Sequence, residues 1–388
     1  MAKSAAGAGT IRKKTVTRKG KQYTYWEARY TVGYDPGTGR QVQRSITGKT
    51  QKEVAQKLKA ATAAIDAGTY QPTVKMTLSQ WLDIWEKDYL GGVKPRTVDS
   101  YKSVIKNHLK PAMGAVRLDS LNAHTIQSFY NGLELSPKSV KNVHGILHKA
   151  LQQAVTNRYI PFNPADACVL PRVVKHEIKP LDEAQISLFL EAIKGHRYEH
   201  LYTVTLFTGM REGEALGLTW DCVDLNKGQI IINKQLQKVR GTGGEYQLVP
   251  TKNSKGRSIT PAPFVLSVLK RVKAQQTMWK LCCGEYWEDD MGLVFTDEWG
   301  HHLCAQTVYL HFKQIAASIG LPEARFHDLR HSYAVAAIRA GDDIKTVQEN
   351  LGHATASFTL DVYGHVTEQM KQASADRMET FIKAVSNS

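Results

Sequence analysis

Phe326-His327-Asp328-Leu329-Arg330-His331-Ser332 is the most informative stretch of this sequence, and Leu351-Gly352-His353 and Asp361-Val362-Tyr363 follow it closely. His327 and Arg330 stand three positions apart, so on a helix they share one face. Histidine and arginine side chains on one face form a cationic pocket, and a tyrosine hydroxyl lies just downstream. Such a pocket suits an anion whose charge is spread over several oxygens, above all a phosphodiester.

Two stretches further upstream also carry basic residues. Thr208-Gly209-Met210-Arg211-Glu212-Gly213-Glu214 sets an arginine at a predicted helix–turn–helix junction, with a glutamate three positions later. Thr251-Lys252-Asn253-Ser254-Lys255-Gly256-Arg257 offers two lysines in the predicted turn of a hairpin. Taken alone, the arginine and glutamate of the first stretch are equally consistent with an ordinary buried salt bridge. The two lysines of the second stretch, taken alone, are typical of surface charge.

Length and composition restrict the class of protein. A chain of 388 residues is expected to form two or three domains. No apolar run approaches the roughly 18 residues that span a bilayer, and the N-terminus lacks an apolar signal core, so we expect a cytoplasmic protein. Five scattered cysteines fit a reducing compartment. Without a C-x-x-C pair, no zinc site is expected from the cluster Cys282, Cys283, His301, His302 and Cys304.

The positive charge is concentrated at the N-terminus. The formal net charge is +15, and residues 1–75 hold 15 Lys and Arg against 4 Asp and Glu. Such an excess is either a solvated basic tail or an electrostatic footprint for nucleic acid, where neutralised phosphates release counterions. An anionic membrane surface fits less well, because no amphipathic helix with an aromatic and leucine face accompanies the charge. We therefore expect nucleic acid, and no membrane, as the partner.

Residues 1–70 predict a small domain with a three-stranded sheet and one helix. Residues 23–30 alternate with a period of two and are rich in aromatics, Asp35-Pro36-Gly37 signals a turn, and a helix is expected over 51–67. Basic and aromatic side chains interleave on the strands, as a reader of a DNA groove requires, although the aromatics also suit the core of so small a domain. The candidate DNA contacts are Arg12, Lys13, Lys14, Arg18, Lys21, Tyr25, Arg29, Arg40 and Arg44.

Residues 71–175 predict a domain of four helices. Thr77 is the expected N-cap of the first, Pro95 and Pro137 open the second and fourth, and the third is expected over 123–133. Single lysines on the polar faces of such helices are ordinary solvated side chains, but as a set beside a basic N-terminus they favour contacts with backbone phosphates. These candidates are Arg96, Lys102, Lys138 and Lys141.

Residues 176–388 predict a larger α-rich domain with a small antiparallel sheet. The expected helices lie near 182–194, 199–209, 212–218, 263–276, 305–319, 328–340 and 343–350, with a strand over 229–235 and a hairpin over 246–260. Gly341 and Gly352 are expected to end helices of this series. A last helix over 367–384 carries an apolar stripe. The chain as a whole is therefore expected to be mainly α, within the α+β class.

The order of these motifs resembles the tyrosine recombinase family, the lambda-type integrases. Residues 181–388 contain the motifs in that family's order: an arginine, a hairpin lysine, H-x-x-R, L-G-H, and a tyrosine about ten residues later. The helical region, with S-P-K-S-V-K-N and N-P-A, resembles the core-binding domain of the family. The basic sheet resembles the arm-type DNA-binding domain of phage and conjugative-transposon integrases. One departure is the hairpin, which often reads T-K-T in the family and reads T-K-N-S-K-G-R here.

The resemblance implies a role for each matching residue. Arg211 and Arg330 look like the two catalytic arginines, His327 and His353 like two pocket histidines, and Tyr363 like the nucleophile. Lys252 resembles the hairpin lysine, with Lys255 as the alternative that the departure leaves open. Glu214 matches an acidic position that orients the first arginine.

The chemistry of these residue types points the same way. Arginine forks match the geometry of a phosphate, stay charged, and stabilise charge that grows in the transition state. A free tyrosine hydroxyl titrates near ~10, so neighbouring cations must activate it, and His327 is a candidate to accept its proton. Lys252 can protonate the leaving 5′ oxygen, and His353 can hydrogen-bond a non-bridging oxygen. We expect no metal and no other cofactor, since the sequence has neither a P-loop nor an acidic cluster for two metals.

The resemblance implies a site-specific integrase that forms a 3′-phosphotyrosyl intermediate on double-stranded DNA. Its expected partners are core and arm attachment sites and further copies of the chain in a homotetramer, within a bacterial host cell. An excisionase and a host DNA-bending protein are further candidate partners, and the last helix docks on its own domain or on a neighbouring protomer. A type IB topoisomerase shares the chemistry, but the separate basic domain argues against it. A DNA-binding regulator has no need of the whole set of cations and the tyrosine.

Overall fold

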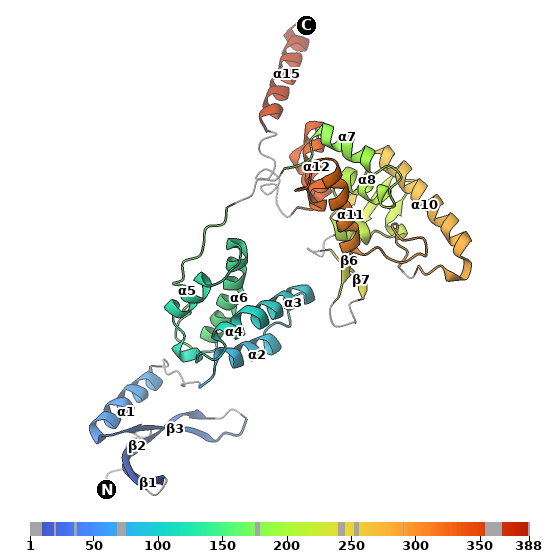
Figure 1. Ribbon diagram of the computed structural model, residues 1–388. Helices are drawn as coiled ribbons and strands as arrows, with labels where there is room; N and C mark the ends of the chain where they lie inside the picture. The colour runs from blue at the N-terminus through green and yellow to red at the C-terminus, as the bar shows by residue number, and fades with distance from the viewer. Residues whose placement is uncertain are drawn as a thin grey trace. The chain divides into compact units, whose positions relative to one another are not determined.

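The computed structural model describes residues 10–18, 21–34, 37–67, 75–174, 179–239, 245–251, 256–289, 291–353 and 367–386. The chain divides into two compact units, Met1–Val173 and Val174–Ser388, here called the N-terminal and C-terminal units. Within the described ranges, no helix combines the length and the apolar character needed to cross a membrane. Figure 1 shows the helices and strands, coloured from blue at the N-terminus to red at the C-terminus.

The N-terminal sheet consists of β1 (Thr10–Arg18), β2 (Lys21–Tyr34) and β3 (Gln41–Gly48), antiparallel and in that order. Every second residue of β2 faces the helix α1 (Gln51–Asp66), so Ala28 and Tyr30 pack on Val54 and Leu58. Thr50 caps α1, because its side chain accepts a hydrogen bond from Glu53 N. The predicted three-stranded sheet with one helix is therefore confirmed (Figure 1).

The helical part of the N-terminal unit has its own hydrophobic core. Its helices are α2 (Leu78–Asp88), α3 (Pro95–Val104), α4 (Lys110–Met113), α5 (Ala123–Asn131) and α6 (Pro137–Thr156), with a π-helical turn η1 (Ile105–Leu109) and a 3₁₀ turn η2 (Leu118–Ser120). Trp81 of α2 is fully buried and donates from Nε1 to Ala150 O of α6 at 2.9 Å. Thr77 and Gln80 form a capping box at the start of α2.

The second predicted helix of this region contains a π-helical turn. It runs from α3 through η1 into α4, past Pro111. Proline has no N–H to donate to the preceding turn and its ring crowds the carbonyl four residues earlier, so a wider π turn just before it accommodates the ring. Leu109 and Met113 of this extension are buried in the helical core.

The C-terminal unit is built around the apolar helix α8. Its helices are α7 (Glu183–Ala192), α8 (Glu199–Thr208), α9 (Glu212–Leu216), α10 (Pro263–Cys283), α11 (Ala305–Ser318), α12 (Phe326–Arg339), α13 (Ile344–Leu351) and α15 (Thr367–Ser386), with 3₁₀ turns η3 (Trp220–Cys222) and η4 (Gly284–Tyr286). Seven of the ten residues of α8 are buried, on all sides of the helix. A helix that is apolar all round belongs in the centre of a core, and α8 contacts α9, α10 and α12 there.

The strands of this unit pair differently from the prediction. They are β4 (Val223–Asp224), β5 (Gln229–Ile232), β6 (Lys234–Lys238), β7 (Tyr246–Pro250) and β8 (Arg257–Ile259). β7 pairs with β6, and β8 pairs with β5. The expected hairpin within residues 246–260 is therefore wrong. Residues 229–232 belong to the strand that pairs with β8 and residues 234–238 pair with β7, so the two partners meet this stretch on either side of Asn233.

Candidate active site

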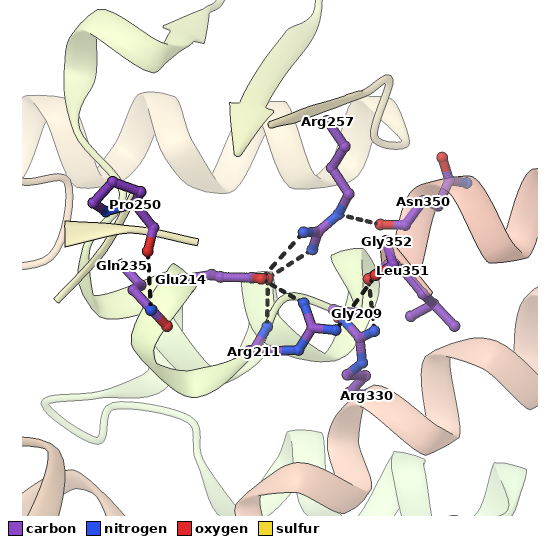
Figure 2. Close-up of polar contacts among 10 residues, drawn as sticks. All are labelled: Gly209, Arg211, Glu214, Gln235, Pro250, Arg257, Arg330, Asn350, Leu351 and Gly352. Carbon is purple, nitrogen blue, oxygen red and sulfur yellow. Dashed lines mark hydrogen bonds and ion pairs between the residues drawn. The ribbon is translucent and has the colours of Figure 1, made fainter. Parts of the chain in front are cut away.

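Arg211 is placed by a tight junction between α8 and α9. Gly209 ends α8 with φ +64°, and a Cβ there would lie 2.5 Å from Tyr333 Cδ1, so the position requires glycine. Arg211 then caps α9, where its backbone N donates to Glu214 Oε2 at 3.0 Å and its Nη1 donates to Glu214 Oε1 at 2.6 Å. The glutamate at the third position thus fixes both the backbone and the side chain of the arginine (Figure 2).

Arg330 lies on α12 and only 1% of it is exposed. Its Nη1 donates to Gly209 O at 2.7 Å and its Nη2 donates to Leu351 O at 2.6 Å. These carbonyls close α8 and α13, so one buried guanidinium on α12 joins the ends of two other helices (Figure 2). Carbonyl oxygens at the C-terminal ends of helices carry partial negative charge and stabilise the cation there.

Glu214 is the acidic centre of the site, and 1% of it is exposed. Besides Arg211 it binds Arg257, whose Nη1 lies 3.1 Å from Oε1 and whose Nη2 lies 2.7 Å from Oε2. Burial alone would raise the pKa of Glu214, but the hydrogen bonds and charges of Arg257 and Arg211 outweigh it and hold the pKa at about 2. The carboxylate is therefore ionised at any working pH.

Arg257 was not among the predicted site residues. Its Nε also donates to Asn350 O at 2.7 Å, so it reaches the last turn of α13. Its partners Glu214 and Asn350 lie 43 and 93 positions away in the chain. Local spacing carries no signal for such contacts, which is why the sequence did not reveal it.

Two predicted histidines belong to the same pocket. His327 lies on α12, and His353 follows Gly352, which ends α13 with φ +64°. Burial and the charges of Arg330 and Arg211 lower the pKa of His327 to about 4 and that of His353 to about 3. Both imidazoles are therefore neutral near pH 7. The charges of both arginines therefore act on His327 and on His353.

His331 is a further histidine of this pocket that the prediction did not assign. It stands one turn after His327 on α12, and the two rings meet edge to face with centroids 4.9 Å apart. Burial and the neighbouring His327 lower the pKa of His331 to about 4. Its spacing from His327 in the motif is the sequence signal that could have singled it out.

Three predicted residues of the site lie outside the described ranges. They are the two alternative lysines, Lys252 and Lys255, and the tyrosine, Tyr363. Thr251, the neighbour of Lys252, is buried, and its N–H donates to Asn233 O at 3.3 Å. The arginines, histidines and Glu214 therefore define the described part of the site.

The basic residues of the N-terminal sheet divide between its two faces. Cross-strand pairing puts Arg12, Lys14 and Arg29 on the open face, which points away from α1. They surround Glu27, to which they lie 2.8, 3.4 and 3.9 Å away. Tyr25, and by register Lys21, share that face; Arg18 pairs with Lys21, but only its backbone is described.

Lys13 and Arg44 lie on the other face of the sheet, the one that packs on α1. Lys13 pairs with Trp26, and Arg44 pairs with Tyr30, both of which join the core with α1. The alternation Val42, Arg44, Ile46 was the sequence signal for this placement. The remaining candidates, all exposed, are Arg40 before β3 and, in the helical part, Arg96, Lys102, Lys138 and Lys141.

The cysteine and histidine cluster makes contacts of its own. His301 bridges Asp297 and Glu288 at 3.2 and 3.1 Å, and Tyr246 Oη lies 3.4 Å from Cys304 Sγ. Among the described residues, no three His, Cys, Asp or Glu side chains are grouped so that they could hold a metal ion.

Two family profiles match the chain. Residues 179–370 match the phage integrase family, and residues 77–134 match the phage integrase N-terminal SAM-like domain. The chain is 28% identical over 381 residues to the tyrosine recombinase XerC-like protein of Caldanaerobacter subterraneus subsp. tengcongensis, covering 93% of this chain and 96% of that protein. It is 23% identical to the ICEBs1 integrase of Bacillus subtilis, covering 91% and 96%.

Solved structures share the fold. A fragment of the Tn1549 transposon integrase in complex with transposon right end DNA matches with a TM-score of 0.67 and 23% identity, over 78% of this chain and all of that fragment. The lambda integrase, in a tetramer bound to a Holliday junction, matches with a TM-score of 0.55 and 20% identity, over 88% of this chain and 93% of that chain. The expected mainly α fold of the α+β class, with small antiparallel sheets, is confirmed.

Proposed function

Because the chain belongs to the phage integrase family and is a tyrosine-type site-specific recombinase, we propose that it integrates and excises a mobile element through a 3′-phosphotyrosine intermediate. The observation that carries this proposal is the paired-arginine pocket. Arg211 and Arg330 come from distant parts of the chain and meet where α8 and α13 end, beside His327 and His353.

The two arginines bind the scissile phosphate in this mechanism. Their guanidinium groups face the non-bridging oxygens and stabilise the negative charge that grows there as the fifth bond to phosphorus forms. Because Glu214 and the backbone carbonyls hold both arginines before DNA arrives, little reorganisation is needed at the moment of reaction. His353 donates a hydrogen bond to one of the same oxygens.

The nucleophile is the hydroxyl of Tyr363. Its oxygen attacks phosphorus in line with the 5′ oxygen, the bond from phosphorus to the 5′ oxygen breaks, and a 3′-phosphotyrosine and a free 5′ hydroxyl result. His327 accepts the tyrosine proton, since burial and the arginine charges leave its imidazole unprotonated at neutral pH. Lys252 delivers a proton to the leaving 5′ oxygen. The reverse attack by a 5′ hydroxyl of a new strand rejoins the DNA without ATP.

The rest of the chain delivers DNA to this pocket. Residues 1–70 act as an arm-site binding domain, residues 71–175 as a helical core-binding domain, and residues 176–388 as the catalytic domain. The separate hydrophobic cores of the sheet and of the helical part support the first division. The cations on the open face of the sheet support a phosphate-binding role for the first domain.

The reaction takes place in a homotetramer on DNA. Met378, Phe381, Ile382 and Val385 of α15 are between 49% and 62% exposed and follow the i, i+3, i+4, i+7 spacing of a single helix face. An apolar stripe of this kind suits docking on a neighbouring protomer, which would couple cleavage to assembly. An excisionase and a host DNA-bending protein would set the direction of recombination.

A nicked suicide substrate tests the proposed chemistry. A nick just downstream of the cleavage position, in DNA that carries the joined ends of the element, lets the short 5′-hydroxyl fragment diffuse away and traps the covalent protein–DNA complex. We expect the wild-type protein to form the complex, and Tyr363→Phe to bind the same DNA with equal affinity but form none. A covalent complex with Tyr363→Phe, or none with the wild-type protein, would overturn the proposal.

A further inference from the structure

Arg257 joins three segments of the pocket that are distant in the sequence. It begins β8, contacts Glu214 of α9 through both Nη atoms, and donates from Nε to Asn350 O of α13 (Figure 2). Its side chain is 11% exposed. This arginine does not itself bind the phosphate or move a proton in the proposed reaction.

The contacts of Arg257 fix the plane of the Glu214 carboxylate. Oε1 accepts from Nη1 of both Arg211 and Arg257, and Oε2 accepts from the Arg211 backbone N and from Arg257 Nη2. The terminal torsion of a glutamate is broad, so a carboxylate with one arginine can rotate. Two arginines prevent that rotation. The position of the Arg211 guanidinium, which is bonded to Oε1, then follows from the contacts of Arg257.

The charge of Arg257 has a separate effect. Arg211 and Glu214 alone would form a neutral pair, since one positive and one negative side chain lie 2.6 Å apart. Arg257 supplies a second positive charge 2.7 Å from the same carboxylate. The attraction of the Arg211 guanidinium for an incoming phosphate is therefore less weakened by Glu214.

Arg257 also supports the turn that carries His353. Gly352 has φ +64°, and a Cβ there would lie 3.0 Å from Arg257 Cδ, so the turn packs directly on the arginine stem. Arg211 Nη2 lies 3.5 Å from Gly352 O on the same turn. One side chain thus touches the supports of both Arg211 and His353.

We propose that Arg257 is a positioning residue of the reaction, which holds the Glu214 carboxylate so that Arg211 is aimed and charged for the scissile phosphate. The inference rests on the proposed function, since it gives Arg257 a role through Arg211. Displacing a catalytic group by about 1 Å can slow a reaction by about 10²-fold. Loss of Arg257 should therefore reduce the rate of cleavage while leaving the affinity for DNA intact.

The test compares variants of the full chain on the suicide substrate. Arg257→Gln removes the charge and the fork, Arg257→Lys keeps the charge, and Arg197→Gln is the control, because Arg197 faces Glu298 at 3.7 Å outside the pocket. We expect Arg257→Gln to slow single-turnover formation of the covalent complex by about 10- to 100-fold at saturating protein. Arg257→Lys should be slowed less, and Arg197→Gln and all dissociation constants should match the wild type.

A second substrate separates positioning from a merely structural role. A methylphosphonate at the scissile position replaces one charged non-bridging oxygen by a methyl group, so the reaction depends less on the charge of Arg211. The deficit of Arg257→Gln should shrink several-fold on this substrate. It should persist on a 5′-bridging phosphorothiolate, which relieves only the need to protonate the leaving group. Equal deficits on all three substrates, or a wild-type rate, would overturn the inference.

A double variant completes the test. If Arg257 acts through Glu214, then Arg257→Gln combined with Glu214→Gln should be no slower than the slower single variant; multiplied deficits would contradict the inference. Where Arg257→Gln does not fold, Arg257→Lys carries the same comparison of substrates. Failure of the wild-type protein to form any complex would instead overturn the proposed function, so the two failures are distinct.

Discussion

Two buried carboxylates in this chain each bind two or three basic side chains, Glu27 in the N-terminal sheet and Glu214 in the C-terminal unit. Around Glu27 the side chains of Arg12, Lys14 and Arg29 are 52%, 38% and 54% exposed. Around Glu214 those of Arg211 and Arg257 are 29% and 11% exposed, and both reach backbone carbonyls at the C-terminal end of α13. Both clusters place basic side chains around one carboxylate, but the basic side chains around Glu214 are less exposed and more tightly bound than those around Glu27.

The difference indicates what each cluster can do. Exposed cations on a sheet can follow the phosphates of a duplex, and their ion pairs with Glu27 contribute little to stability. Cations that are bound to carbonyls and to a buried carboxylate cannot adapt to phosphates at different positions, but they hold one fixed geometry for a single phosphate. We therefore expect substitutions in the first cluster to change affinity, and substitutions in the second to change the rate.

Arg330 should give the largest effect. It is the most buried of the site cations that the structure describes, and Arg330→Gln removes a fork from the phosphate and the link between the ends of α8 and α13. We expect the rate of covalent complex formation to fall by about 10²- to 10³-fold. Single-turnover assays with Arg29→Gln as the matched arginine should show no loss on core-site DNA. Equal losses for the two variants would contradict the conclusion that only the cations of the C-terminal pocket set the rate of cleavage.

The lysine of the site should come next, and this experiment decides between Lys252 and Lys255. General acid catalysis contributes about 10²-fold or more, so alanine at the correct lysine should slow cleavage by about that factor. A 5′-bridging phosphorothiolate leaves without a proton, and it should restore cleavage to Lys252→Ala. Restoration of Lys255→Ala alone would assign the role to the other lysine.

The acid stability of the C-terminal unit depends on Glu214. Its folded pKa of about 2 lies below its ordinary value of 4.5, so its contribution to stability is present above about pH 4.5 and is lost as pH falls toward 2. At neutral pH that contribution is roughly 3 kcal/mol, since one pKa unit corresponds to about 1.4 kcal/mol. Hydrogen exchange of α8 and α12 between pH 5 and pH 2.5 measures the loss, which Glu214→Gln should make smaller, while the buried His327, His331 and His353 still contribute their share. An unchanged slope in that variant would contradict the assignment.

The sheet should give the smallest effect. Arg29 lies on the open face and Arg44 on the α1 side, so the two form a matched pair. Arg29→Ala should lower affinity for arm-site DNA several-fold and reduce the slope of log K against log salt by about 0.9, the value for one lost phosphate contact. Arg44→Ala should leave the slope unchanged. A larger effect of Arg44→Ala would assign DNA binding to the other face.

Local sequence signals predicted most of the helices of the fold. Caps and stops such as Thr77, Pro137 and Gly352 marked helix ends correctly because each acts on the backbone within its own turn. The pairing of β7 with β6 was missed because strand register depends on partners elsewhere in the chain.

The site followed the same rule. Arg211 and Glu214, three positions apart, interact as their spacing indicated, and so the motif was readable from the sequence. Arg257 was not, because its importance arises only when β8, α9 and α13 meet. Roles for Lys252 and Tyr363 remain predictions from the resemblance and from chemistry, since both lie outside the described residues.

The identity of the covalent bond tests the proposed chemistry at its decisive step. The trapped protein–DNA complex is digested with protease and nuclease, and the modified peptide is sequenced by mass spectrometry. We predict a single nucleotide attached through its 3′ phosphate to Tyr363, with a 5′ hydroxyl on the released strand. Attachment to another residue, such as Tyr333 beside Gly209, or through a 5′ phosphate, would contradict the central claim that this pocket activates Tyr363.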